Sequence, residues 1–316
     1  MDGILIIDKP DGFTSHDVVA RIRRVLQTKR VGHTGTLDPF ATGVMIVLVG
    51  KATRLAQFLD KDEKEYEAIV RFGFETDTGD RTGVLTRSSK PENVPPGIKS
   101  QISNLITIEE INNALENFRG ETEQIPPMYS AKKIDGKKLY ELARKGIEVE
   151  RKPVRINVSK IEAFEVPENI AENNTNIEIR NVDLGLRVSC SAGTYIRTLA
   201  EDIGRKIGIG AHLAELRRIR AGKFLISEGV TLDELQKADD PRSYLLPMEA
   251  AVSHLSPFVL NADRTAKTLN GLSTRINNAG FENGQVIQML NENQKIIAIG
   301  FYNEAKNAVQ PKIVLN

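Results

Sequence analysis

The sequence predicts an α/β protein with one large domain and a small β-rich domain at its C-terminal end. Its 316 residues exceed the usual size of a single domain, and 40% of them are apolar, which is enough for a sizeable core. Strand-like and helix-like segments are interspersed in the first part of the chain, whereas short strands with turns follow a boundary near 236–247. We therefore expect one domain over 1–247 and a second over 248–316.

The N-terminal elements follow from their hydrophobic patterns. Residues 3–8, GILIID, form a short apolar strand. Residues 14–27 carry apolar side chains at helical spacing behind a cap at Thr14 or Ser15. The run VMIVLV over 44–49 predicts a strand that is buried on both faces.

Later segments are assigned in the same way. Alternation over 64–76 predicts another strand, and residues 88–104 form a polar connection. A helix over 107–118 opens with a capping box between Thr107 and Glu110. The remaining predicted elements are strands over 154–164 and 184–191, a helix over 194–208, and C-terminal strands over 284–290, 295–302 and 311–316.

Composition and motifs exclude several classes of protein. No apolar run has the length of a membrane span, and the N-terminus lacks the basic start of a signal peptide. The single cysteine, Cys190, excludes an intrachain disulfide and fits a reducing compartment. One Cys and four His without ligand spacing make a structural zinc site unlikely. We expect a cytoplasmic protein that needs neither a membrane nor a metal.

Positive charge is concentrated in three segments, although the net charge is only +1. Residues 9–30 hold six Lys or Arg against two acids, residues 128–155 hold nine against four, and residues 205–223 hold six against one. Three solvated faces would explain this pattern without any partner. A polyanion groove explains it better, because only local charge releases counterions from phosphates. The distribution therefore favours a nucleic-acid partner.

The glycine-rich segment GHTGTLDPFATGVM, residues 32–45, places Asp38 directly before the buried strand. It fits no phosphate-binding loop or Rossmann fingerprint, and the chain has no G-x-S-x-G nucleophile elbow. Asp before Pro is most often a turn residue. Here the surrounding glycines allow a ligand to approach closely, with His33 five residues upstream. Asp38 is thus a candidate nucleophile or general base.

This segment resembles the catalytic motif of the bacterial, stand-alone tRNA pseudouridine-55 synthase family, whose members isomerise a uridine in the T-loop of tRNA. Further segments resemble the motifs of that family in the same order along the chain. They are GILIIDKPDGFTSHDVV, KEYEA, GFETDTGDRTG, QIPPMYSAKKIDGKKLYELARKG, VSCSAGTYIRTLAEDIG and GAHLAELRRIRAGKF. The resemblance spans about residues 3–248.

The resemblance implies a fold, a reaction and a partner. The fold is a pseudouridine-synthase-like large mixed, mostly antiparallel sheet flanked by helices, followed by a small β-barrel-like (PUA-like) domain. The reaction is an isomerisation in which the base is flipped out, detached and rejoined through C5, without cofactor or metal. The partner is the T-arm stem-loop of tRNA, and no obligatory protein partner is expected.

The resemblance also assigns roles to individual residues. At the reacting base it implies Asp38 as the catalytic aspartate, Arg197 as its ion-pair partner, Tyr66 stacked on the flipped uracil, Tyr195 and Leu216 lining the pocket, and His33 touching the RNA. Around it, the resemblance implies support from Lys9, Pro10 and Asp77, and an RNA clamp at about 124–152 with Lys132, Lys133, Lys137 and Lys138. Without the motifs, Tyr66, Tyr195 and Leu216 would be interpreted as core residues.

Two alternatives remain at this stage. A guide-RNA-dependent relative would rely on partner proteins, and the long basic insertion at 124–152 argues for the stand-alone type instead. A non-catalytic RNA chaperone would fold tRNA by the same grip. It would gain nothing from retaining Asp38, Arg197 and Tyr66.

Overall fold

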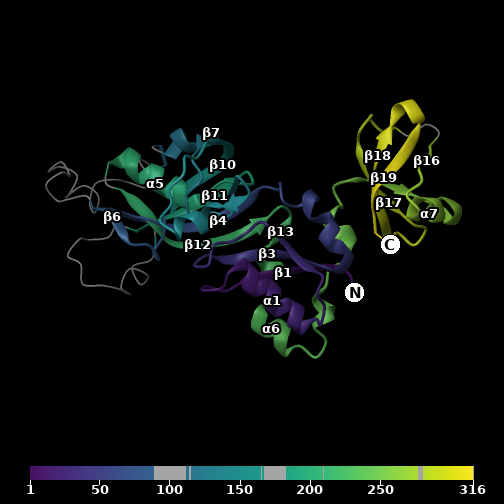
Figure 1. Ribbon diagram of the computed structural model, residues 1–316, viewed down its shortest axis with the longest axis horizontal. Helices are drawn as coiled ribbons and strands as arrows, with labels where there is room; N and C mark the ends of the chain where they lie inside the picture. The colour runs from purple at the N-terminus through teal and green to yellow at the C-terminus, as the bar shows by residue number, and fades with distance from the viewer. Residues whose placement is uncertain are drawn as a thin grey trace.

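The computed structural model describes residues 1–88, 112–113, 115–164, 166, 183–208, 210–276 and 280–315. Within these residues one ten-stranded sheet forms the frame of the first three quarters of the chain (Figure 1). In spatial order its strands are β14 (Val230–Thr231), β1 (Gly3–Lys9), β3 (Thr42–Val49), β12 (Ala211–Ala221), β4 (Lys64–Phe72), β11 (Asp183–Cys190), β10 (Val154–Phe164) and β7 (Gly120–Gln124), with β2 (Val31–Thr34) on β3 and β13 (Phe224–Leu225) on β12.

The sheet is mixed and mostly antiparallel, as predicted. Among the described strands, parallel pairing occurs between β1 and β14 and between β3 and β12. The strand β3 is buried along nearly its whole length, which confirms the interpretation of VMIVLV. The predicted strand over 64–76 is divided, because Gly73 has a φ of 115° and turns the chain between β4 and β5 (Phe74–Thr76).

Helix α1 (Ser15–Val25) packs its apolar face on the β1–β3 part of the sheet. Thr14 is the N-cap, in a capping box with Asp17 that satisfies two backbone N–H groups at the helix start. Val18 and Ile22 are fully buried against this part of the sheet and against α6 (Leu232–Lys237). This packing holds the strand pair that carries the loop of Asp38.

Helix α5 (Ile196–Ile207) covers the β4, β10, β11 and β12 part of the sheet (Figure 1). It ends at Gly208, whose φ of 91° is the left-handed conformation that favours glycine at a helix end. Leu199 and Ile203 pack into the largest core cluster, together with Val188 of β11. The helix begins one residue before Arg197. The packing of α5 in this core therefore fixes the backbone position from which the Arg197 side chain extends.

Shorter elements connect these parts. The hairpin β5–β6 (Leu85–Ser88) precedes the undescribed stretch, and η2 (Glu116–Phe118) follows it. The polar connection 88–104 and the Thr107 capping box lie almost entirely outside the described residues. The other short elements are η1 (Gly50–Phe58), β8 (Lys133–Ile134), β9 (Lys137–Lys138), α4 (Leu139–Ala143), η4 (Ile226–Glu228), η5 (Pro241–Tyr244), η6 (Met248–Ala251) and η7 (Glu304–Lys306).

A separate five-stranded sheet lies at the C-terminal end and stands at one end of the molecule (Figure 1). Its strands, in spatial order, are β15 (Ser256–Val259), β17 (Val286–Leu290), β18 (Ile296–Asn303), β19 (Ala308–Val314) and β16 (Thr274–Arg275), with helix α7 (Ala262–Leu269) beside them. The three longest match the strands predicted from sequence. Ile299 and Ile313 share a core cluster with Ile46 of β3 and Leu55 of η1, so the two parts of the chain are packed together.

No helix among the described residues is long and apolar enough to span a membrane.

Candidate active site

The loop of Asp38 is held from both sides. It joins β2 to β3, and the flanking Leu37 and Phe40 are buried in the main core cluster. The Ser15 hydroxyl at the start of α1 accepts from the backbone N–H of Leu37 at 3.0 Å and donates to its carbonyl at 3.1 Å. The carboxylate of Asp38 is therefore carried on a rigid turn.

Lys9 fixes the other side of this loop. Its side chain is fully buried, and its ammonium donates to the carbonyls of Pro10 at 2.8 Å, Phe13 at 2.6 Å and Pro39 at 3.1 Å. Burial lowers the pKa of Lys9 to about 8, against the attraction of nearby carboxylates that include Asp38. The cation therefore supports the loop next to Asp38, where the resemblance placed Lys9 and Pro10.

Arg197 approaches Asp38 from the first turn of α5. Its Nη2 donates to Oδ1 of Asp38 at 3.2 Å, and its Nε lies 2.9 Å from Oδ2 as an ion-pair contact without hydrogen-bond geometry, so both carboxylate oxygens face the guanidinium. The same guanidinium donates to the carbonyls of Thr78 at 2.8 Å and Tyr129 at 2.7 Å. Since only 4% of the Arg197 side chain is exposed, its fork is held in one orientation.

Asp80 completes this charge arrangement and was not predicted from sequence. Its Oδ2 lies 3.8 Å from Nη1 of Arg197. Its Oδ1 accepts from the Thr78 hydroxyl at 2.9 Å, and from the backbone N–H and the hydroxyl of Thr82 at 2.9 and 2.6 Å. Asp77 instead accepts from the backbone N–H of Val84 at 2.7 Å and serves the hairpin.

A cavity of about 260 Å³ opens beside the Asp38–Arg197 pair. Tyr66 of β4, Leu216 of β12 and Tyr195 at the start of α5 line it, so the structure brings the predicted pocket residues together with Asp38. Tyr195 is anchored by the buried side chain of Gln124, which accepts from its N–H at 2.8 Å and donates to its carbonyl at 3.0 Å. The Asp38 carboxylate, two phenols and an apolar side chain thus face one small space.

Burial dominates the titration of the site. It raises the pKa of Asp38, against the lowering effect of Arg197, and Asp80 raises that pKa further. About a third of the Asp38 side chain (32%) remains exposed, on the side that faces the cavity system. Burial also raises the pKa of the Tyr66 phenol, and the neighbouring Arg218 opposes this shift. Tyr66 is therefore a neutral phenol at neutral pH.

A second cavity, of about 530 Å³, meets the first at Asp38 and Arg197. The N-terminal turn of α1, the turn of Asp80 and the insertion of the predicted clamp surround it, with Tyr140 and Lys138 among its lining residues. Asp38 is thus accessible from both cavities, and the insertion forms one wall of the larger one.

Comparison with known proteins places this arrangement in a family. Residues 23–196 match the model of the TruB family pseudouridylate synthase N-terminal domain, and residues 197–253 match that of the tRNA pseudouridylate synthase B C-terminal domain. The chain belongs to the TruB family of pseudouridylate synthases. It is accordingly a pseudouridine synthase, an isomerase that modifies RNA.

Individual relatives agree with this assignment. A tRNA pseudouridine synthase B of Aquifex aeolicus is 39% identical over 316 residues, which is 100% of both chains. Another, of Solibacter usitatus, is 45% identical over 236 residues, or 75% of this chain and 72% of that one. A chain in the crystal structure of a Cbf5-Nop10-Gar1 complex has a TM-score of 0.67 and 28% identity, covering 99% of this chain and 85% of that chain.

The remaining candidates of this TruB-family chain lie around the site. His33 on β2 is half-buried, and its Nδ1 has no hydrogen-bond partner among the described residues. It packs edge-on against His16 at 6.1 Å between ring centroids, and His33 lines neither of the two cavities. Lys133 and Lys137 are exposed on the β8–β9 hairpin. Lys132 and Lys138 are half-buried there.

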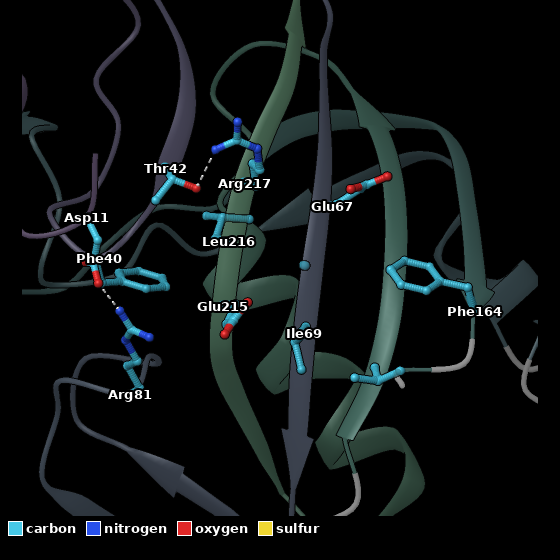
Figure 2. A pocket seen from close by; sticks show the side chains of 12 residues that line it. Asp11, Phe40, Thr42, Glu67, Ile69, Arg81, Phe164, Glu215, Leu216 and Arg217 are labelled. Atoms are coloured by element: carbon cyan, nitrogen blue, oxygen red, sulfur yellow. Dashed lines mark hydrogen bonds and ion pairs between the residues drawn. The ribbon is translucent and has the colours of Figure 1, made fainter. Parts of the chain in front are cut away.

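A third hollow, of about 360 Å³, shares Leu216 with the first cavity but is not lined by Asp38, Tyr66 or Arg197 (Figure 2). Glu67 and Ile69 of β4 line it, and strand alternation places them on the face opposite to Tyr66. Figure 2 shows Glu215 and Arg217 of β12 on the same face, while Asp38 does not line this hollow. Its charged lining fits a solvent-exposed sheet face.

Proposed function

We propose that this tRNA pseudouridine synthase acts on uridine 55 in the T-loop and that Asp38 is its catalytic carboxylate. The observation that carries the proposal is the two-point contact between Asp38 and the buried Arg197 at the mouth of a base-sized cavity. A guanidinium in this position holds the carboxylate ionised and oriented toward the reacting atoms.

The proposed reaction detaches uracil from C1′ of the ribose, turns the base and rejoins it through C5. Asp38 attacks the base, attacks the sugar or removes a ribose proton, and each route needs an ionised carboxylate. Tyr66 and Leu216 enclose the flipped base, and the Tyr66 hydroxyl relays the C5 proton. No group outside the chain and the substrate enters this scheme.

The base reaches the cavity by flipping out of the T-loop. Unstacking a base costs a few kcal/mol, which backbone contacts and stacking in the pocket offset. Lys132, Lys133, Lys137 and Lys138 supply such backbone contacts as a clamp at the wall of the wider cavity. The division into domains at 1–247 and 248–316 belongs to the same proposal, with the C-terminal sheet as a second RNA contact.

The guide-RNA-dependent alternative has one observation in its favour, the fold similarity to the Cbf5 chain. The relatives named tRNA pseudouridine synthase B are more similar in sequence, at 39% and 45% identity against 28%. We therefore favour the stand-alone enzyme.

The test is incubation of the purified chain with an unmodified tRNA transcript, followed by chemical mapping of pseudouridine. We expect modification at position 55 without added protein or guide RNA. Modification that requires a guide RNA would favour the alternative. Tight binding without any modification would favour the chaperone.

A further inference from the structure

Two buried cations line the candidate cavity without a carboxylate at ion-pair distance. Arg218 on β12 is 1% exposed and Lys64 on β4 is 6% exposed, and both line the same cavity as Asp38. Among the described residues, neither forms an ion pair within 4.0 Å. Buried charges are normally paired, so this arrangement calls for a physical reason.

Backbone carbonyls hold the two cations in place. Arg218 donates from Nε to the carbonyl of Val44 at 2.7 Å and from Nη2 to that of Gly35 at 3.2 Å. Lys64 donates to the carbonyls of Asp60, at 2.9 Å, and Asp62. Carbonyl dipoles fix the positions of the cations, but no carboxylate of the described residues lies within 4.0 Å to neutralise either of them.

The two cations lie close together at the Asp38 loop. A side chain at Gly35 would place its first carbon 3.6 Å from Nη1 of Arg218 and 3.9 Å from Cε of Lys64. Burial and repulsion from Arg218 lower the pKa of Lys64, while the carboxylates of Asp60 and Asp62 act in the opposite direction. An anion in the cavity would relieve this repulsion.

Arg218 also faces Tyr66 directly. The two residues are opposite each other in the β12–β4 register, and the guanidinium charge acts to lower the pKa of the Tyr66 phenol, against the effect of burial. The positive charge is therefore next to the ring on which, under the proposed function, uracil stacks.

We propose that Lys64 and Arg218 form a fixed cationic floor that stabilises the negative charge developing on uracil during the isomerisation. The inference rests on the proposed function. The two residues act by their field from a buried cavity wall, where preorganised charges are most effective.

Each route open to Asp38 puts negative charge on the base. If Asp38 bonds to C1′ or removes the C2′ proton, the N1–C1′ electron pair leaves with uracil as an anion. If Asp38 adds to C6, the C5–C6 electron pair moves onto the ring as an enolate, and the N1–C1′ bond then breaks with its electron pair on N1. C5 next bonds to C1′. In the first route this displaces Asp38 from C1′, and in the second Asp38 returns its proton to C2′. In the third route Asp38 leaves C6 as the C5 proton is lost. Loss of the C5 proton and protonation of N1 give neutral pseudouridine in every route. The cations stabilise the charged stage in all three routes.

The test compares two tRNA transcripts, with uridine or 5-fluorouridine at the target position. Fluorine withdraws electrons, so the 5-fluorouracil anion needs less stabilisation than the uracil anion. The single-turnover rate of base detachment is measured by rapid quench and nucleoside analysis, and tRNA affinity is measured separately. Fluorine takes the place of the C5 proton, so the final loss of that proton cannot occur. The comparison between the two transcripts is therefore limited to detachment and rejoining of the base.

We expect Arg218→Met to slow detachment of uracil by about 10²–10³-fold, with tRNA affinity changed by a few fold at most. The defect should be several times smaller with 5-fluorouridine, and Arg218→Lys should recover most of the lost rate. Lys64→Gln should slow uracil detachment in the same way as Arg218→Met. It replaces Arg218→Met as the test variant if Arg218→Met fails to fold. Arg217→Met is the matched control, because Arg217 is adjacent on β12 but is neutralised by Asp8 at 2.7 Å. It should detach both bases at nearly the wild-type rate.

Equal defects with uridine and 5-fluorouridine would overturn the inference and mean that the cations only maintain structure. Wild-type rates of uracil detachment in both Arg218→Met and Lys64→Gln would overturn it as well. A wild-type chain that leaves the uridine transcript unmodified would instead overturn the proposed function itself. The two failures are therefore distinguishable.

Discussion

The Asp38–Arg197 contact is oriented by groups that do not react. Arg197 is tied to the carbonyls of Thr78 and Tyr129, so its fork cannot turn away when substrate enters. The opposite side of the guanidinium faces Asp80 at 3.8 Å. Arg197 thus lies between two carboxylates, one exposed to the cavities and one buried, and the buried one influences the titration of the other.

The first prediction concerns pH. Ionised Asp38 is needed for reaction, and burial raises its pKa, so the rate should fall on acidification at a higher pH than for an ordinary aspartate. Asp80 contributes to this rise. Asp80→Asn keeps an oxygen for the Thr78 and Thr82 contacts but removes the charge, so the acid limb of the single-turnover pH–rate profile should move to lower pH. Asp77→Asn is the control, and a limb that stays in place in Asp80→Asn would contradict the account.

The second prediction separates two roles of Tyr66. Tyr66→Phe keeps the ring, so base stacking worth roughly 1–3 kcal/mol should survive. It removes the hydroxyl, so the rearranged base should form and product release should stall. Tyr66→Leu should lose both binding and turnover. Single-turnover assays with product analysis distinguish these cases, and full activity of Tyr66→Phe would leave only a stacking role.

Sequence reasoning reached Asp38 and the residues around its cavity through the motifs, and it named Asp77 as a support but did not name Asp80. The two lie three residues apart in TDTGD, and composition cannot show which one turns inward. In the structure, Thr78 and Thr82 donate to Asp80 and fold the turn around it. Leu213 of β12 holds this turn through its backbone. Its N–H donates to the carbonyl of Gly79 at 3.0 Å, and its carbonyl accepts a backbone N–H from the same turn.

At the scale of elements, strand β12 was the main one that sequence patterns missed. Its segment AHLAELRRIRA is rich in Ala, Leu and Arg, which favour helices. Register shifts between Leu213 and Glu215, and between Arg218 and Arg220, interrupt the alternation of a regular strand. Between the two shifts, regular alternation over residues 215–218 places Leu216 and Arg218 at the cavity and Arg217 on the other face.

The third prediction concerns the hairpin β8–β9 and its flanks. Replacing Lys132, Lys133, Lys137 and Lys138 by Gln should weaken tRNA binding and reduce the slope of log affinity against log salt by about two to four. Replacing the exposed Lys160 and Lys237 is the control and should leave the slope unchanged. If the four-lysine variant keeps the wild-type slope, these side chains do not contact phosphates.

At the scale of the whole molecule, the C-terminal sheet is packed to the catalytic part through a shared apolar cluster. Ile299 and Ile313 meet Leu55 and Ile46 in it, and all four are buried. The sequence predicted the three longest strands of this sheet but not its docking, because apolar patterns do not reveal which surface covers a given face. The two sheets are thereby held in one arrangement.

The fourth prediction tests this docking. Leu55→Ala removes a fully buried side chain at the junction and should lower the free energy of unfolding by about 2–5 kcal/mol. Amide hydrogen exchange in β18 and β19 should accelerate as well, although Leu55 lies in η1. Unchanged exchange in those strands, together with an unfolding loss confined to the large sheet, would show that the two parts are energetically independent.

The central claim is that Asp38 performs the isomerisation at position 55 of tRNA. The most direct measurement is single-turnover mapping of pseudouridine on an unmodified tRNA transcript with wild-type protein and Asp38→Asn, with tRNA affinity measured in parallel. We predict modification at position 55 by the wild type, none by Asp38→Asn, and affinities that agree within a few fold. Pseudouridine formation by Asp38→Asn at close to the wild-type rate would contradict the account.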